Sequence, residues 1–275
     1  MRLRIAHDTG YRYERPVRSL IQVLRLTPRS HDGQHVRAWR IEPSVYGRLK
    51  PQEDALGNLV HVFSSEAAVQ ELRIRVTGEV ETSDANGFVR GAVERVPDVF
   101  FLRDTDLTQP DAAIREFARD VAGDAPADPL GALHRLLNGL NREIAFDTEP
   151  TQATTTAAEA FALRRGVCQD LTHVFVAAAR SIGIPARYVS GYFCRADGVV
   201  QQDAGHAWAE AKAPDLGWVG FDPTNGICTT AAYVRVAIGL DYLGAAPVRG
   251  SRTGGGSESL DVKLRVENAQ RQSQN

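Results

Sequence analysis

The chain has 275 residues, 43% of them hydrophobic and 24% charged, which is enough for one large or two ordinary domains with a full apolar core. Its formal net charge of −2 removes the electrostatic basis for binding nucleic acid. We expect no membrane span, because no run of roughly 18 apolar residues is present. We also expect a cytoplasmic location, because the first residues lack the apolar stretch of a signal peptide.

Strand-like patterns dominate the first part of the chain. Apolar or bulky side chains alternate with polar ones over residues 3–13, 36–41 and 72–80, and residues 58–63 form a short β-prone run. Prolines and glycines separate these segments, as turns between strands do. The pattern predicts an N-terminal antiparallel β-sandwich-like domain over residues 1–100.

Helical spacing replaces this alternation after about residue 95. Residues 111–121, 130–144 and 154–163 repeat apolar side chains at intervals of three and four, which is typical of amphipathic helices. Further strands follow later in the chain. We therefore predict an α+β fold and assign residues 101–267 to a second domain that includes the C-terminal strands.

A fourth amphipathic helix follows Gly166. Its apolar stripe runs from Leu171 to Ile182, and Gly183-Ile184-Pro185 ends it. Cys168 therefore lies in the first turn, where unpaired backbone N–H groups and the helix dipole stabilise a thiolate. This position favours Cys168 as a nucleophile, and we expect Asp170 only to support the same turn.

A thiolate nucleophile needs a proton carrier beside it. His173 is a poor candidate, because five residues along a helix place it about 140° away from Cys168, and His134 lies on a leucine-rich helix where a structural role is expected. His206 begins a predicted strand after Gly205, so it can face the start of the helix across a cleft.

Asp222 ends the next predicted strand and is followed by Pro223. A carboxylate there could accept the N–H of the His206 imidazole and steady its charged form, as the third member of a catalytic triad does. The alternative is a plain Asp-Pro turn.

The end of the chain contains three different patterns. Residues 249–257 are rich in glycine and serine and predict a mobile loop, whereas residues 260–266 alternate as a last strand. Residues 268–275 are polar, and we expect a flexible tail.

The three cysteines predict neither disulfides nor a metal site. Their number is odd and no C-x-x-C pair occurs, which is typical of a reducing compartment. We expect Cys194 and Cys228 to be small buried side chains. A zinc site would need a fourth ligand such as His206, and the spacing matches no known zinc pattern.

Four motifs occur in order in the second domain: G-V-C-Q-D, G-I-P-A-R-Y-V-S-G-Y, G-H-A-W-A-E and F-D-P-T-N. Together they resemble the core of the transglutaminase-like superfamily, in the bacterial branch often described as cysteine proteases, over about residues 140–245. The β-rich first part is similar to the extra domain that precedes this core in that branch.

The resemblance implies a papain-like, transglutaminase-like α+β core. It also implies Cys168 as the nucleophile, His206 as the acid and base, and Asp222 as the group that orients His206. The calcium-binding residues of animal transglutaminases have no visible counterpart, and no D-x-D-x-D-G loop is present. We therefore expect no metal and no cofactor.

These residues predict a thiol enzyme that acts on amide bonds of peptides or proteins through a thioester. The backbone N–H of Cys168 is the first expected oxyanion donor, and the sequence does not name a second. Hydrolysis is favoured over transfer to an amine, because a bacterial cytosol gains little from general crosslinking. The alternatives are a protein-glutamine gamma-glutamyltransferase and a non-catalytic binding module.

Three further expectations concern the surroundings of the site. We expect Trp208 and Trp218 to pack in the core instead of lining a tunnel that excludes water. We expect residues 201–203 to form a solvated turn. The oligomeric state cannot be read from this sequence.

Overall fold

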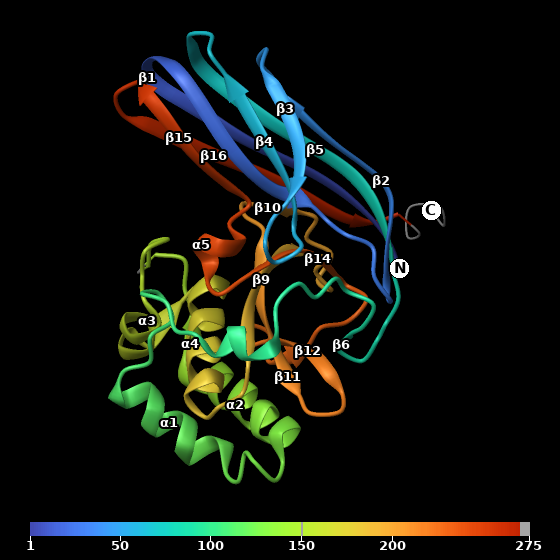
Figure 1. Cartoon of the computed structure of the whole chain (residues 1–275), viewed down its shortest axis with the longest axis vertical. Coiled ribbons are helices and arrows are strands. Elements are labelled where there is room, and N and C mark those ends of the chain that lie inside the picture. Colours follow the sequence, from blue (N-terminus) through green and yellow to red (C-terminus); the bar gives the residue numbers. More distant parts are fainter. Residues whose placement is uncertain (150, 270–275) are drawn as a thin grey trace.

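Two β-sheets, one above the other in Figure 1, form the framework of the molecule, and most of the helices pack beside the lower one. This computed structural model describes residues 1–149 and 151–269. Helices and strands are largely segregated, so the predicted α+β class is confirmed. In the described part of the chain, no helix has both the length and the apolar character needed to cross a membrane.

The upper sheet is antiparallel and has eight strands. They are β1 (Arg2–Thr27), β2 (Gln34–Pro43), β3 (Arg48–Glu53), β4 (Leu59–Ser65), β5 (Val69–Thr82), β10 (Gln201–Gln202), β15 (Val248–Gly254) and β16 (Glu258–Asn268). Residues 201–203, expected to form a solvated turn, thus contribute a short strand that pairs with β16.

The long strand β1 organises the upper sheet. Its first half pairs with β5 and β16, and its second half pairs with β4 and β15. Side chains from both halves, such as Tyr13 and Leu24, share one buried cluster with Phe63 and Ile74. The predicted antiparallel architecture is therefore correct, but one curled sheet replaces two separate sheets because β1 belongs to both halves.

The C-terminal strands correct the predicted domain boundaries. Residues 249–257, expected to be a mobile loop, include most of β15, which pairs with β1 from Val17 to Leu24. Strand β16 pairs with the first half of β1, so it joins the upper sheet and not the core. Asn268 pairs with Leu3 in this ladder. The rest of the predicted tail, residues 270–275, lies outside the described residues.

The lower sheet has six strands. They are β6 (Phe88–Val89), β9 (Ala186–Phe193), β11 (His206–Ala213), β12 (Gly217–Asp222), β13 (Ile227–Cys228) and β14 (Tyr233–Gly239). Strand β14 lies at one edge and pairs with β9, while β11 lies in the middle between β9 and β12.

Four helices occupy the positions that the apolar spacing predicts. They are α1 (Ala112–Ala122), α2 (Pro129–Glu143), α3 (Ala157–Leu163) and α4 (Cys168–Ser181). The short α5 (Tyr242–Ala245) is not among the predicted helices. A 3-10 turn (Asp98–Leu102) and the short paired strands β7 (Ala145–Phe146) and β8 (Arg165–Gly166) complete the fold. Helix α4 packs on β9 and β11, and its apolar face is completely buried.

A second buried cluster joins the two sheets. Leu3, Val80 and Leu264 from the upper sheet pack with Tyr192 and Val234 from the lower sheet. Cys168 lies against the edge of the same cluster. The start of helix α4 is therefore close to the junction of the two sheets.

Candidate active site

Cys168 is the first residue of α4, as the sequence predicts. Val167 precedes it in extended conformation, and the buried carboxylate of Asp170 accepts the Val167 N–H at 2.8 Å. Thr172 donates its hydroxyl to the carbonyl of Cys168 at 2.6 Å. The turn that carries the thiol is thus held by hydrogen bonds, while the cysteine itself stays partly exposed.

Asp170 does more than complement the helix dipole. Its side chain is almost completely buried and also accepts the hydroxyl of Thr151 at 2.7 Å. Burial raises the pKa of this carboxyl, against the effect of both hydrogen bonds. A Cβ atom added to Gly166 would lie 2.7 Å from Asp170, so the glycine is needed for this close approach.

His206 and Asp222 meet at the ends of adjacent strands. The Nε2 atom of His206, at the start of β11, lies 2.6 Å from Oδ2 of Asp222, at the end of β12. The other ring nitrogen, Nδ1, is the one available to the Cys168 thiol, with which the imidazole also interacts. The structure therefore brings all three residues singled out from the sequence into one cluster.

The electrostatics of the cluster favour a charged imidazole. Burial lowers the pKa of His206, but the hydrogen bonds and charges of Asp222 and Cys168 outweigh it and raise the pKa to about 10. At neutral pH the ring is therefore an imidazolium between two acidic groups. This arrangement can hold a proton next to a nucleophilic sulfur.

Asp222 is fully buried and its oxygens are saturated with donors. Oδ2 accepts hydrogen bonds from the Tyr233 hydroxyl and the Asn225 side chain, both at 2.7 Å. Oδ1 accepts the backbone N–H groups of Thr224 at 3.0 Å and Asn225 at 3.2 Å. Burial raises the pKa of this carboxyl, but His206 and these donors bring it below its ordinary value.

Aromatic rings surround the imidazole. The centroids of Phe193 and Tyr233 lie 5.2 Å and 6.0 Å from that of His206, and Trp208 lies at 6.3 Å. Trp208 and Trp218 are both buried in one apolar cluster, so the prediction that they pack in the core is confirmed. The imidazole therefore lies in a largely aromatic environment.

Sequence reasoning missed the tyrosines of the site. Tyr233 lies in no recognisable sequence motif. It belongs to β14, which comes after Asp222 in the chain, and its hydroxyl reaches Asp222 from that strand. Tyr188, on β9, is fully buried close to Cys168; burial first, and then the Cys168 charge, raise its pKa well above the usual value. Both phenols therefore remain O–H donors. The alternation in G-I-P-A-R-Y-V-S-G-Y would have placed Tyr188 on the helix-facing side of its strand.

The rejected histidines lie outside the cluster. His173 is buried and its Nε2 accepts the backbone N–H of Tyr242 at 3.0 Å. Burial lowers its pKa to about 4, so it is neutral at pH 7. His134 is exposed, and its ring meets the edge of Phe221. Cys228 is partly buried, and burial raises the pKa of its thiol.

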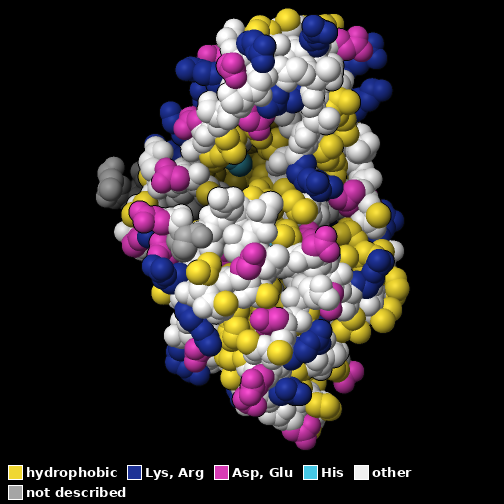
Figure 2. Space-filling model, turned by 90° about the vertical axis from the view of Figure 1, so that its left-hand side faces the viewer, with side chains coloured by type: hydrophobic (Ala, Val, Ile, Leu, Met, Phe, Trp, Pro, Cys, Tyr) yellow, Lys and Arg dark blue, Asp and Glu magenta, His cyan; other side chains and the backbone are white. Residues whose placement is uncertain are grey.

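A hollow opens on one side of the molecule between the upper sheet and the helical part. Figure 2 shows that hydrophobic side chains line it and that a histidine is visible at its base. Over residues 1–149 and 151–269, no group of three or more His, Cys, Asp or Glu side chains is arranged to hold a metal ion.

Two family models match the chain. The model described as the transglutaminase-like superfamily matches residues 115–223, and the model described as the bacterial transglutaminase-like N-terminal region matches residues 3–81. An uncharacterized protein of Mycobacterium leprae is 31% identical over 279 residues, which cover 96% of this chain and 98% of that protein.

More distant similarities extend to proteins with a described activity. A protein-glutamine gamma-glutamyltransferase of Pseudomonas aeruginosa is 30% identical over 157 residues, covering 51% of this chain and 23% of that protein. The crystal structure of a candidate cysteine protease from Cytophaga hutchinsonii superimposes with a TM-score of 0.77 at 18% identity, covering 98% of this chain and 91% of the other. The two chains therefore share their fold over nearly their whole length.

Proposed function

This chain belongs to the transglutaminase-like superfamily, and from that premise we propose that it is a cysteine-dependent enzyme that acts on amide bonds of peptides or proteins. The observation that carries the proposal is the imidazolium of His206, held between Cys168 and the buried carboxylate of Asp222. Such a pair supplies both a nucleophilic sulfur and a proton for the leaving group.

The first half of the reaction forms a thioester. The Cys168 thiolate attacks the carbonyl carbon, and the π electrons move to the oxygen. The backbone N–H of Cys168 begins a helix and has no acceptor within it, so it can stabilise that oxyanion. One such donor is typically worth about 2.7–4 kcal/mol of barrier. The C–N bond then breaks, and the nitrogen takes the Nδ1 proton of His206.

The second half returns the enzyme to its starting state. Water gives a proton to His206 and attacks the thioester carbonyl, and the C–S bond breaks to release a carboxylic acid and the thiolate. A primary amine in place of water would give a new amide. Cys168 is partly exposed and therefore open to attack by water on its thioester, so we favour hydrolysis.

Amine transfer is the second candidate. The similarity to the gamma-glutamyltransferase of Pseudomonas aeruginosa over about half of this chain supports it. Mass spectrometry of a glutamine-containing peptide, with and without a primary amine, separates the two. Conversion of the glutamine amide to a carboxylic acid, or cleavage of the peptide, indicates hydrolysis. Incorporation of the amine into the peptide indicates transfer.

Thiol labelling tests whether the site is active at all. Limited iodoacetamide at about pH 6 should alkylate Cys168 well ahead of Cys194 and Cys228, because only Cys168 has the imidazolium of His206 and a helix N-terminus beside its sulfur. The His206→Ala variant should lose this preference. Equal labelling of the three cysteines, or labelling unchanged in His206→Ala, would leave the non-catalytic binding module as the better account.

A further inference from the structure

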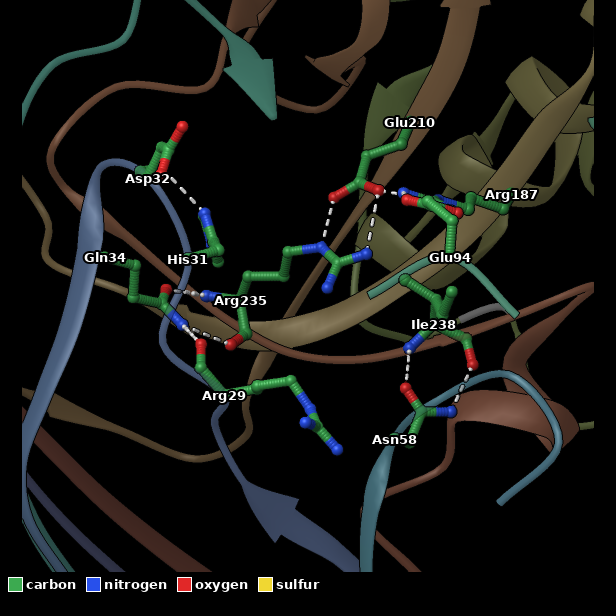
Figure 3. Close-up of polar contacts among 10 residues, drawn as sticks. All are labelled: Arg29, His31, Asp32, Gln34, Asn58, Glu94, Arg187, Glu210, Arg235 and Ile238. Atoms are coloured by element: carbon green, nitrogen blue, oxygen red, sulfur yellow. Dashed lines mark hydrogen bonds and ion pairs between the residues drawn. The ribbon is translucent and has the colours of Figure 1, made fainter. Parts of the chain in front are cut away.

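Strand β14 lies at the edge of the lower sheet and faces the upper sheet. It pairs with β9 on one side, and its other side carries backbone N–H and C=O groups that no strand of the described chain satisfies. An open edge of this kind is normally covered by a side chain, a loop or another strand. Here two side-chain amides from the upper sheet and its loops cover it (Figure 3).

Gln34 and Asn58 each replace one peptide of a neighbouring strand. The Gln34 Oε1 accepts the N–H of Arg235 at 2.7 Å, and its Nε2 donates to the Arg235 carbonyl at 2.9 Å. The Asn58 Oδ1 accepts the N–H of Ile238 at 2.8 Å, and its Nδ2 donates to the Ile238 carbonyl at 2.9 Å. Both side-chain amides are buried, so water does not compete for these hydrogen bonds.

The two amides are themselves fixed by their own part of the chain. Gln34 Nε2 also donates to the Arg29 carbonyl at 2.9 Å, and Asn58 Nδ2 also donates to Asp54 at 3.0 Å. The hydroxyl of Thr82, at the end of β5, adds a bond of 2.5 Å to the Ala231 carbonyl just before β14. The upper sheet and its loops thus bind β14 along its open edge.

A buried ionic network holds the same strand from the other side. The Arg235 guanidinium bonds the carboxylate of Glu210 on β11 at 2.7 Å, and Glu210 also binds Arg187 on β9 at 2.7 Å (Figure 3). Burial raises the pKa of Glu210, but the two guanidinium groups outweigh it and lower the pKa to about 2. The network therefore stays charged at neutral pH, with Glu94 completing the pairing of Arg187.

Strand β14 begins with Tyr233, whose hydroxyl donates to Asp222. We infer that the upper sheet is a working part of the active site: Gln34 and Asn58 hold β14 in place, and β14 holds Tyr233 on Asp222. Tyr233 is then a positioning residue that fixes the carboxylate behind His206. The inference rests on the proposed function, because it gives Tyr233 a role in orienting His206, the proposed partner of the nucleophile Cys168.

The inference predicts a change in the pH dependence of Cys168 alkylation. The titratable groups around Asp222 are His206 from β11, Tyr233 from β14 and, beyond them, Cys168 and Cys228. Removing the Tyr233 hydroxyl takes one donor from the buried carboxylate of Asp222. The carboxylate then supports the imidazolium of His206 less well, and we expect alkylation of Cys168 to need a higher pH.

The experiment measures the rate of iodoacetamide alkylation of Cys168 against pH by mass spectrometry. Tyr233→Phe should move the acidic limb of this pH profile upward by about one pH unit. At a fixed pH on that limb, Cys168 would then react about tenfold more slowly. Gln34→Met and Asn58→Leu, which keep the volume but remove the amide bonds, should move it in the same direction. Gln70→Met, the same change as Gln34→Met at an exposed position of β5, should leave the limb unmoved.

A double-mutant comparison tests the route of the effect. If Gln34 and Asn58 act through Tyr233, their substitutions should add less than about twofold in the Tyr233→Phe background. An equal effect in both backgrounds, or an unmoved limb in Tyr233→Phe, overturns the inference. Circular dichroism confirms that each variant is folded. If an amide variant does not fold, the pH profile of Tyr233→Phe, which only deletes a hydroxyl, still decides whether Tyr233 positions Asp222.

The proposed function fails in a different way. In that case Cys168 of the unaltered chain reacts no faster than in His206→Ala, whatever residue stands at position 233. If Cys168 is reactive but the acidic limb of its pH profile is unmoved in the variants, the proposed function stands and the inferred role of the upper sheet is wrong.

Discussion

At the scale of single residues, Asp222 accepts more hydrogen bonds than Cys168 or His206 does. It is buried, and a buried carboxylate without donors takes up a proton near neutral pH. Donors from three different directions, Tyr233, Asn225 and His206, keep it ionised. Its charge in turn raises the pKa of His206, so the imidazolium beside the Cys168 thiol depends on this carboxylate.

Replacing Asp222 by asparagine tests this dependence. Asp222→Asn keeps the volume but removes the charge, so the imidazolium loses its support and the ring can adopt the wrong tautomer. Turnover should fall by roughly 10⁴-fold, as for the same change in other triads. Peptide turnover and far-UV circular dichroism are measured together. Asp215→Asn, the same change in an exposed turn, is the control, and full activity in Asp222→Asn would show that the triad assignment is wrong.

At the scale of elements, the first turn of α4 decides where the sulfur points. Val167 is in extended conformation, and Asp170 closes the turn by accepting the Val167 N–H. Asp170 can approach this closely only because residue 166 has no side chain. The glycine, the aspartate and the cysteine therefore act as one local unit.

Gly166→Ala should disturb this unit. The added Cβ would lie 2.7 Å from an Asp170 oxygen and 2.8 Å from the Asp170 Cβ, and the Asp170 side chain is buried. We expect a loss of about 1–3 kcal/mol in the free energy of unfolding, typical of overpacking, together with slower Cys168 alkylation.

Gly10→Ala is the matched control for that substitution. Its new Cβ would meet the nearest atoms at 3.7 Å or more, which is ordinary contact. Chemical denaturation measures the free energy of unfolding of both variants. Equal stability and equal Cys168 reactivity in the two would rule out the close approach of Asp170 as the reason for a glycine at position 166.

At the scale of the whole molecule, the first strand and the last described strands lie in the same upper sheet. Strand β16 pairs with β1 and contributes Leu264 to the cluster that joins the two sheets. Strand β15 extends the other half of β1. Strand β16 therefore stabilises the junction beside which Cys168 lies.

Two leucines of β16 test this role with the same substitution. Leu264 is 1% exposed, so Leu264→Ala should cost about 2–5 kcal/mol of unfolding free energy through lost burial and a cavity. Leu260 is 58% exposed on the same strand, and Leu260→Ala should change stability by less than about 0.5 kcal/mol. Urea denaturation gives both values, and a small change in Leu264→Ala would mean that β16 is not an integral part of the junction.

Local patterns in the sequence were sufficient for the elements that carry Cys168, His206 and Asp222. For helix α4 and the strands β11 and β12, the spacing of apolar side chains and the residues at the ends of each segment predict the element. The order of the four motifs then indicated that these three residues meet, and in the structure they do.

The sequence by itself thus determined the class of the fold, the helices α1 to α4 and the three residues of the cluster. Only the tertiary structure decided that β15 and β16 leave the core for the upper sheet, and that Tyr233, Gln34 and Asn58 support the site. The reason is physical: alternation shows that a segment is a strand, but its partner is chosen by long-range hydrogen bonds and burial, which no local period records.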